Sequence, residues 1–223
     1  MPGTHQHQIE LESLSMEKLL EQIKKCQACV NLPLGPRPVV QGHPDARLLI
    51  ISQAPGLRVH ETGIPWNDQS GDRLRQWLGL SAKDFYNPKL VALLPMGFCY
   101  PGRAKTGDAP PRKECYELWH QAFISQLDNR KLTLLIGNYA QKKYLKDIAK
   151  KNATETIRSW REYLPDFIPM PHPSPRNNIW LDKNPWYPEM EIPAIRQLVH
   201  NALRSEPKPQ TFQLNTKDFE DRP

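Results

Sequence analysis

The sequence lacks two features that would direct a protein to a membrane. No apolar stretch is long enough to cross a bilayer, and the first residues, MPGTHQHQIE, have no apolar core of the kind found in signal peptides. We therefore expect a cytoplasmic protein with no membrane partner. Cysteine is also scarce, with 4 residues in 223. In a reducing compartment these are expected to be free thiols or metal ligands rather than disulfides.

Proline is abundant instead. It makes up 23 of the 223 residues, about twice the usual share. The prolines are spread between segments with helix or strand periodicity, so they predict long, stiff loops rather than disorder. Loops held on a rigid scaffold are where binding and catalytic residues concentrate.

Length and charge set broad limits on the fold and its partners. A chain of 223 residues with 39% hydrophobic residues can form one domain of ordinary size. We place that domain over residues 1–204, with a loose leader at residues 1–8, and interpret the polar, aperiodic residues 205–223 as a flexible tail. The net charge of +6 is compatible with a polyanionic partner, although basic tails produce the same value in other proteins.

Apolar runs alternate with helical patterns along the chain. The runs are ARLLIIS from residue 46, LVALLPMGF from residue 90, LTLLIGN from residue 132 and DFIPM from residue 166. Helical patterns cover roughly Gly71–Leu80, Arg112–Leu127, Tyr139–Lys150, Glu155–Leu164 and Ile192–Leu203, and an earlier helix capped by Ser15 runs towards Cys26. Uninterrupted apolar strands between helices predict an α/β fold with a small parallel sheet covered on both faces.

Polar loops follow all four predicted strands. They begin SQAPG, CYPG, GNYAQ and PHPSPRN. In open parallel sheets ligands bind at the carboxyl ends of the strands, so these loops are expected to converge on one site.

The cysteines form a candidate metal site. Cys26 and Cys29 make a C-x-x-C pair, and Cys99 and Cys115 follow far downstream. Four thiolates suit tetrahedral zinc or an iron–sulfur cluster. The alternative is four unrelated buried thiols, because free cysteine is often used as a small apolar residue.

The loop after the first strand, SQAPGLRVHETGIPWNDQSGDRL, is rich in special residues. Pro55 and Gly56 predict a tight turn that exposes backbone amides to a small polar ligand. Trp66 follows on a proline-stiffened loop, where it could stack on a flat ring. Equally, Trp66 could simply pack against the core.

A single histidine, His172, stands between two prolines in MPHPSPRNNIW, residues 170–180. The prolines restrict the backbone on both sides, and the histidine directly follows a predicted strand. This arrangement predicts an imidazole held rigidly at the ligand-binding edge of the sheet. The alternative is a structural histidine that caps a loop.

Taken in order, these motifs resemble the iron–sulfur branch of the uracil-DNA glycosylase superfamily, often called family four, over roughly residues 12 to 203. The branch has a C-x-x-C after a first helix, an A-P-G turn, a glycine matched by Gly63, two further cysteines around a proline-rich loop, and an H-P motif matched by His172 and Pro173. Its P-F-x-x-x-x-G-x-x-L pattern is matched by Pro65, Trp66, Gly71 and Leu74. HPSPRN itself is more similar to the single-strand-selective branch.

The resemblance implies a three-layer α/β/α sandwich around a four-stranded parallel sheet, and a monomeric DNA-repair glycosylase that removes uracil or a related deaminated base from DNA. It implies a [4Fe–4S] cluster on Cys26, Cys29, Cys99 and Cys115. It gives catalytic positions to His172, which would stabilise negative charge at uracil O2, and to Gln53. The implied base contacts are Ser52, Gln53, Ala54, Gly56 and Trp66, and the implied DNA contacts are Ser174, Pro175, Arg176 and Asn177.

Two positions depart from the branch. Its usual turn, G-E-A-P-G, carries a glutamate, but Gln53 cannot act as a general base. Its usual uracil-reading asparagine, four residues before the third cysteine, is replaced by Pro95. Glu61 and Asp68 could position water or be ordinary loop charges.

Two further interpretations therefore stay open beside the glycosylase. The chain could be a lesion-binding relative with weak or no cleavage, or a metal-stabilised protein with an unrelated role. Basic residues such as Arg103, Lys105 and Arg112 are expected to face phosphate, or else only to keep the surface soluble.

Overall fold

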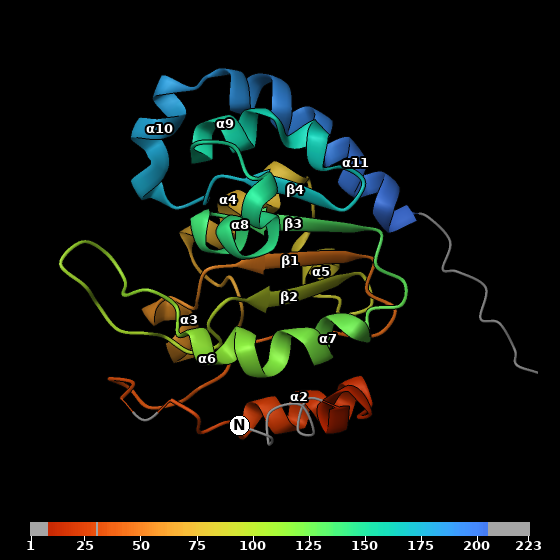
Figure 1. Cartoon of the computed structure of the whole chain (residues 1–223). Coiled ribbons are helices and arrows are strands. Elements are labelled where there is room, and N and C mark those ends of the chain that lie inside the picture. Colours follow the sequence, from red (N-terminus) through yellow and green to blue (C-terminus); the bar gives the residue numbers. More distant parts are fainter. Residues whose placement is uncertain (1–8, 30, 205–223) are drawn as a thin grey trace, which may run out of the picture.

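The centre of the computed structural model is a sheet of four parallel strands (Figure 1). The strands are β1 (Leu48–Ser52), β2 (Val91–Pro95), β3 (Leu132–Ile136) and β4 (Phe167–Met170), in the order β2-β1-β3-β4. The structure describes residues 9–29 and 31–204, so the predicted leader and tail lie outside the described residues. All four predicted strands and their parallel arrangement are confirmed.

Helices surround the sheet. Their bounds are α2 (Met16–Lys24), α3 (Leu57–Thr62), α4 (Gln69–Leu78), α5 (Ala82–Phe85), α6 (Lys113–Cys115), α7 (Gln121–Ser125), α8 (Asn138–Leu145), α9 (Ala153–Arg158), α10 (Asn178–Lys183) and α11 (Ile192–Arg204). Shorter 3-10 or π turns are η1 (Tyr116–His120), η2 (Lys146–Ile148), η3 (Trp160–Tyr163), η4 (Pro175–Asn177) and η5 (Tyr187–Glu191).

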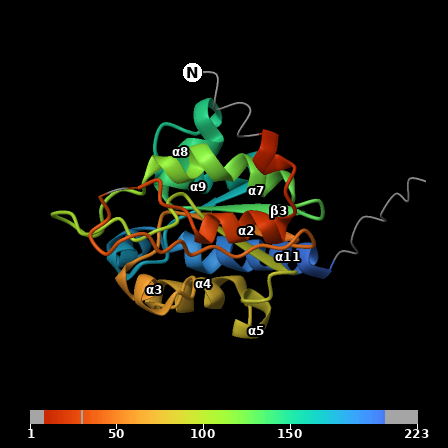
Figure 2. The same ribbon diagram turned by 90° about the horizontal axis from the view of Figure 1, so that it is seen from below.

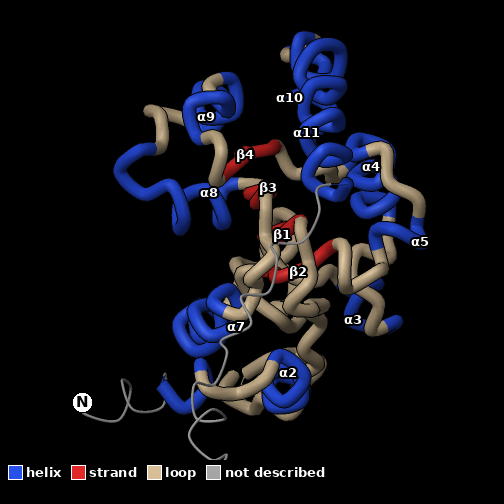
Figure 3. The backbone as a smooth tube through the Cα atoms, turned by 90° about the vertical axis from the view of Figure 1, so that its right-hand side faces the viewer, coloured by secondary structure: helices blue, strands red, loops and turns tan. Residues whose placement is uncertain are grey.

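The sheet buries both faces. In β1, Leu49 and Ile51 point into a core shared with α2, α7 and α8, whereas Leu48 and Ile50 point into a second core shared with α4 and α11. Figure 3 shows α7 and α8 on one side of the sheet and α4 and α11 on the other, and Figure 2 shows α3, α4 and α5 grouped away from α7 and α8. This two-sided burial explains why the strands are continuously apolar, and it confirms the three-layer α/β/α sandwich.

Helix ends differ from the predicted ones for local reasons. The helix expected at Gly71–Leu80 is α4, which begins earlier because Asp68 caps it and ends earlier because Gly79 adopts φ 65°. The segment Arg112–Leu127 is interrupted by the π turn η1, and the segments 139–150 and 155–164 end in 3-10 turns. No helix in the described ranges is both long and apolar enough to span a bilayer.

Candidate active site

A cavity of about 650 Å³ lies where the loops after β1, β2 and β4 meet. The ten residues predicted as catalytic, base-binding or DNA-binding all line it: Ser52, Gln53, Ala54, Gly56, Trp66, His172, Ser174, Pro175, Arg176 and Asn177. The structure thus brings these residues together from distant parts of the chain. Their chemical roles stay predictions.

The turn after β1 is fixed by the end of β2. Met96 N donates to Ser52 O at 2.8 Å, and Gly97 N donates to Gln53 O at 3.0 Å. These bonds hold the turn against the end of β2 and use the carbonyl oxygens of Ser52 and Gln53. Among the described residues, no acceptor binds the backbone amides of Ala54 and Gly56. These two donors therefore stay available on the cavity wall for a polar ligand.

The backbone of Trp66 is held in an unusual conformation. Its φ is 57°, in the left-handed region that bulky residues rarely adopt. Its carbonyl accepts from Arg75 Nη1 at 3.3 Å and from the Tyr86 hydroxyl at 3.4 Å. Gly71 allows this arrangement, since a Cβ at that position would lie 1.7 Å from the Trp66 carbonyl oxygen.

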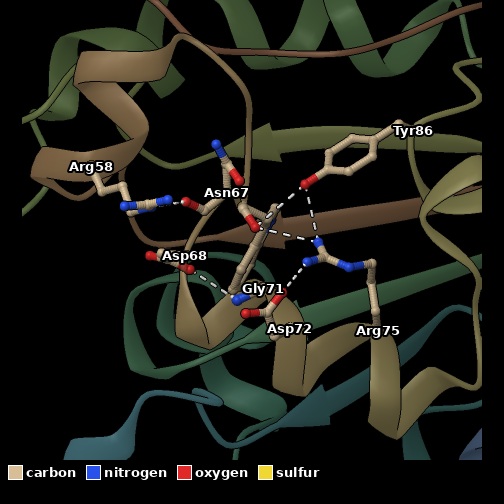
Figure 4. Close-up of polar contacts among 8 residues, drawn as sticks. Arg58, Asn67, Asp68, Gly71, Asp72, Arg75 and Tyr86 are labelled. Carbon is tan, nitrogen blue, oxygen red and sulfur yellow. Dashed lines mark hydrogen bonds and ion pairs between the residues drawn. The ribbon is translucent and has the colours of Figure 1, made fainter.

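Asp68 has two roles in the same loop. Its Oδ1 accepts from Gly71 N at 2.9 Å and so caps α4 (Figure 4). Its side chain also lines the cavity, with Oδ2 3.9 Å from the position that a Cβ on Gly56 would occupy. Glu61, the other carboxylate considered above, is exposed and does not line the cavity.

The loop after β4 orients His172. Ser174 N donates to Nδ1 of the imidazole at 3.2 Å, and Asn177 Nδ2 donates to the His172 carbonyl at 2.7 Å. Because Nδ1 accepts a hydrogen bond, the neutral ring carries its proton on Nε2. The arrangement therefore provides a preset N–H donor at the cavity.

The surroundings of His172 favour this neutral form. Burial lowers the pKa of His172 from 6.5 to about 4; the nearby Asp68 carboxylate opposes that change and the Arg176 guanidinium reinforces it. At neutral pH the imidazole is therefore uncharged. It can donate a hydrogen bond but does not bring a full positive charge to the site.

Trp66 and His172 contact each other. Their ring centroids are 5.7 Å apart and their planes are inclined by 26°. A flat base inserted between two rings needs about 7 Å, two stacking distances of about 3.5 Å each. A base in the cavity must therefore lie beside this pair, where it can meet the edge of the imidazole.

The loop after the second strand was expected at the site, but its hairpin and the cavity residues that it contributes were not predicted. The loop after β2 folds into a small hairpin, with a bridge between Arg103 and Asp108, and it projects from the strand ends in Figure 1. Thr106 and Asp108 of this hairpin line the cavity. The Arg176 guanidinium lies against the hairpin, since a Cβ on Gly107 would come within 2.5 Å of its Nη1.

Other residues were also missed. Arg73, on α4, donates from Nη1 to Asn178 Oδ1 at 2.8 Å and to Ser174 O at 3.4 Å, and so supports the His172 loop. Tyr139, at the start of α8, lines the cavity and is 40% exposed. The GNYAQ loop had indicated this region, but nothing in the sequence around Arg73 pointed to its partners.

Behind Pro95 lies a buried polar pair. His120, on the π turn η1, bonds the Pro95 carbonyl through Nε2 at 3.0 Å and the Tyr144 hydroxyl through Nδ1 at 2.6 Å. Burial lowers the pKa of His120 from 6.5 to about 4, so the ring is neutral. Pro95 lines the cavity, but one lone pair of its carbonyl is already used.

The four cysteines lie near one another, close to the C-terminal end of α2. Every pair among them interacts electrostatically. Burial raises the pKa of Cys99 to about 11 and that of Cys115 to about 12. Within residues 9–29 and 31–204, however, no three His, Cys, Asp or Glu side chains are grouped tightly enough to hold a metal ion. Electrostatic influence extends much further than a metal–sulfur bond of about 2.3 Å, so the two observations are compatible.

The donor set nevertheless fits a thiophilic group. Four thiols from three segments lie near enough to influence one another electrostatically, and Phe98 N donates to Cys115 Sγ at 3.3 Å. Amide bonds to sulfur of this kind stabilise thiolates in metal centres. Arg112, expected at phosphate, instead donates to the carbonyl of Asn31 beside these cysteines at 3.1 Å, while Arg103 and Lys105 are exposed on the hairpin.

One known protein family matches the part of the chain that forms this cavity. The family described as the Uracil DNA glycosylase superfamily matches residues 39–192 of the chain. That stretch contains all four strands and every residue that lines the cavity. The C-x-x-C pair at Cys26 and Cys29 lies before it.

Proposed function

Because the chain belongs to the uracil DNA glycosylase superfamily, we propose that it removes uracil, or a related deaminated base, from DNA by hydrolysing the N-glycosidic bond and leaving an abasic site. The observation that carries this proposal is the neutral imidazole of His172, which offers Nε2–H to a cavity that also contains an indole and free backbone amides. Such an enzyme must flip the base out of the duplex, bind its edge and stabilise the departing anion.

His172 supplies the last of these functions. As the glycosidic bond lengthens, negative charge grows on the leaving base, at O2 of uracil. A fixed N–H donor stabilises this charge more in the transition state than in the ground state, because it needs no reorientation. The bond from Ser174 N and the one from Asn177 to the backbone of His172 provide the fixation.

The remaining cavity residues would bind the base and the strand. The amides of Ala54 and Gly56 suit the polar edge of a base, and Trp66 offers an aromatic surface at the same wall. Ser174 to Asn177 follow His172 directly, so they are the natural segment to enter the gap that a flipped base leaves. Arg103 and Lys105, exposed on the hairpin, would lie near phosphate.

We also propose that Cys26, Cys29, Cys99 and Cys115 hold a [4Fe–4S] cluster. When bound, such a cluster would tie the segment after α2 to the loop between β2 and α6. The thiols come from parts of the chain that are distant in sequence, so a shared ligand would restrict the unfolded chain strongly. This is a structural role, away from the residues of the cavity.

Gln53 and Pro95 favour a second candidate, a relative that binds lesions but cleaves them weakly. A substrate comparison separates the two. Excision under single-turnover conditions is measured on U·G, U·A and single-stranded uracil, with hypoxanthine, xanthine and intact cytosine alongside. Pro95 offers no donor to a base edge, and its carbonyl already binds His120, so we expect mispaired and single-stranded lesions to be cleaved faster than U·A. Salt-dependent DNA binding without excision of any base would support the second candidate instead.

A further inference from the structure

Two carboxylates approach the same residue of the cavity wall, Gly56. Asp68 and Asp108 both line it, and their Oδ2 atoms lie 3.9 Å and 3.7 Å from the position that a Cβ on Gly56 would occupy. They come from different segments, the cap of α4 and the hairpin after β2. A carboxylate at a surface that must approach phosphates weakens DNA binding, so its presence there calls for a chemical reason.

Glycosidic hydrolysis needs such a group. Water must attack C1′ from the side opposite the leaving base, and the sugar gains positive charge as the bond breaks. Gln53 has a neutral amide, which neither accepts the proton of water nor offsets that charge. The missing function must therefore come from another residue of the cavity.

The two carboxylates are not equivalent. Asp68 already uses Oδ1 to cap α4, so one of its two oxygens is committed to the helix. Asp108 lines the cavity, and among the described residues no hydrogen bond or ion pair engages its side chain. A carboxylate with both oxygens available can accept a proton from water, which favours Asp108.

The hairpin holds Asp108 in place. Ala104 N donates to Gly107 O at 2.9 Å and Ala109 N donates to Gly102 O at 2.8 Å, which closes the turn on both sides of Asp108. Arg176 packs on Gly107, so the hairpin is tied to the loop that carries His172. The backbone at Asp108 is thereby held against the loop that carries His172.

We propose that Asp108 is the catalytic carboxylate that positions and deprotonates the attacking water, in a role that rests on the glycosylase function proposed above. The water oxygen bonds to C1′ while the C1′–N bond breaks, and the electron pair of that bond leaves with the base. The proton of the water passes to Asp108 and then to solvent. Before the proton moves, the carboxylate also stabilises the cationic sugar.

The test uses the whole protein and two oligonucleotides that carry abasic-site analogues, a pyrrolidine, which is cationic, and a tetrahydrofuran, which is neutral. We expect the wild type to bind the pyrrolidine at least about tenfold more tightly, and Asp108→Asn to lose most of that preference. Single-turnover excision should fall in Asp108→Asn by about a hundredfold or more. Asp182→Asn, which removes an exposed charge on α10 outside the cavity, should keep both properties.

Several results would overturn the assignment to Asp108. They are an unchanged preference for the pyrrolidine in Asp108→Asn, no such preference in the wild type, or a loss confined to Asp68→Asn, in which asparagine can still cap α4. Asp108→Ala is a second variant in case the first is unstable. If the wild type excises no base but prefers the pyrrolidine through Asp108, the proposed function fails while the position of Asp108 at the sugar stands. If excision occurs without any contribution from Asp108, the proposed function stands and the role given to Asp108 fails.

Discussion

The backbone amide of Ser174 donates to Nδ1 of His172 at 3.2 Å, and this one bond determines which edge of the imidazole can act on a ligand. With Nδ1 occupied, Nε2 carries the proton and is the free donor. The prolines at positions 171 and 173 keep the ring near this partner, since they restrict the backbone on both sides of it.

Loss of the imidazole should affect catalysis more than binding. We expect His172→Ala to lower single-turnover excision by about a hundredfold, the usual effect of removing one donor that stabilises developing negative charge. DNA affinity, measured by fluorescence anisotropy, should change little. His43→Ala, in a loop outside the cavity, is the matched control. Near-normal excision by His172→Ala would show that the histidine motif has another role.

The pH dependence of excision should reflect a neutral histidine. Because burial lowers the pKa of His172 to about 4, its neutral form predominates above about pH 5. Protonation of His172 should therefore not reduce single-turnover rates between pH 8 and pH 5. The check is a rate profile of the wild type beside His172→Asn. A titration near pH 6.5 that disappears in the variant would contradict the lowered pKa.

His120 should make the fold sensitive to acid. Its pKa is about 4 in the folded protein but near 6.5 when exposed, so the unfolded chain binds more protons between these values. Acid therefore favours unfolding. The free energy of unfolding falls as the pH drops from 6.5 towards 4, and His120 contributes up to about 1.4 kcal/mol of this fall per pH unit. Urea unfolding at pH 7, 6 and 5 measures the slope.

The matched variant for this slope is His120→Phe, which keeps an aromatic ring beside Phe98 but removes the titrating group. It should be less stable than the wild type at pH 7, because the Pro95 carbonyl and the Tyr144 hydroxyl lose their partner. Its stability should nevertheless depend less on pH. An equal slope in both proteins would mean that His120 is not the group responsible.

Gly71 should tolerate no side chain. A Cβ there would lie 1.7 Å from the Trp66 carbonyl oxygen, so Gly71→Ala must displace either α4 or Trp66. We expect a loss of about 1–3 kcal/mol in unfolding free energy, typical of overpacking, together with a weaker response of tryptophan fluorescence to single-stranded DNA. Gln76→Ala is the control, because Gln76 is an exposed residue of the same helix and its truncation introduces no clash. Similar losses in both variants would remove the steric argument.

The cysteines should bind iron. Protein purified without oxygen should be brown and contain about four iron atoms per chain. Cys115→Ser should lose the colour and melt at a lower temperature, because the tie between the α2 segment and the β2–α6 loop is gone. Stoichiometric zinc without iron in the wild type would exclude the cluster.

The strands and the outline of the cavity could be predicted because their signals are local. A strand buried on both faces is a continuous apolar run, and the polar residues that follow each run must meet at one edge of a parallel sheet. His172, Trp66 and the turn at Gln53–Gly56 were found in this way.

Asp108 and Arg73 could not be found from local signals. Asp108 faces the cavity only because its hairpin packs under Arg176, 68 positions further along the chain. Arg73 sits on an ordinary amphipathic helix, and its partners Ser174 and Asn178 are about a hundred residues away. The short helices α3, α5 and α10 were missed because four to six residues carry too little periodicity.

The position of β4 at one edge of the sheet has a consequence for how the protein comes into being on the ribosome. The chain is made from its amino end, so β1, β2 and β3 can assemble while the segment from Phe167 onwards is still being synthesised. A nascent chain at that stage has the β1 turn and Trp66 but not His172. The cavity is completed only when β4 joins the sheet. A chain truncated before His172 would therefore lack the imidazole donor altogether, rather than have a lower activity.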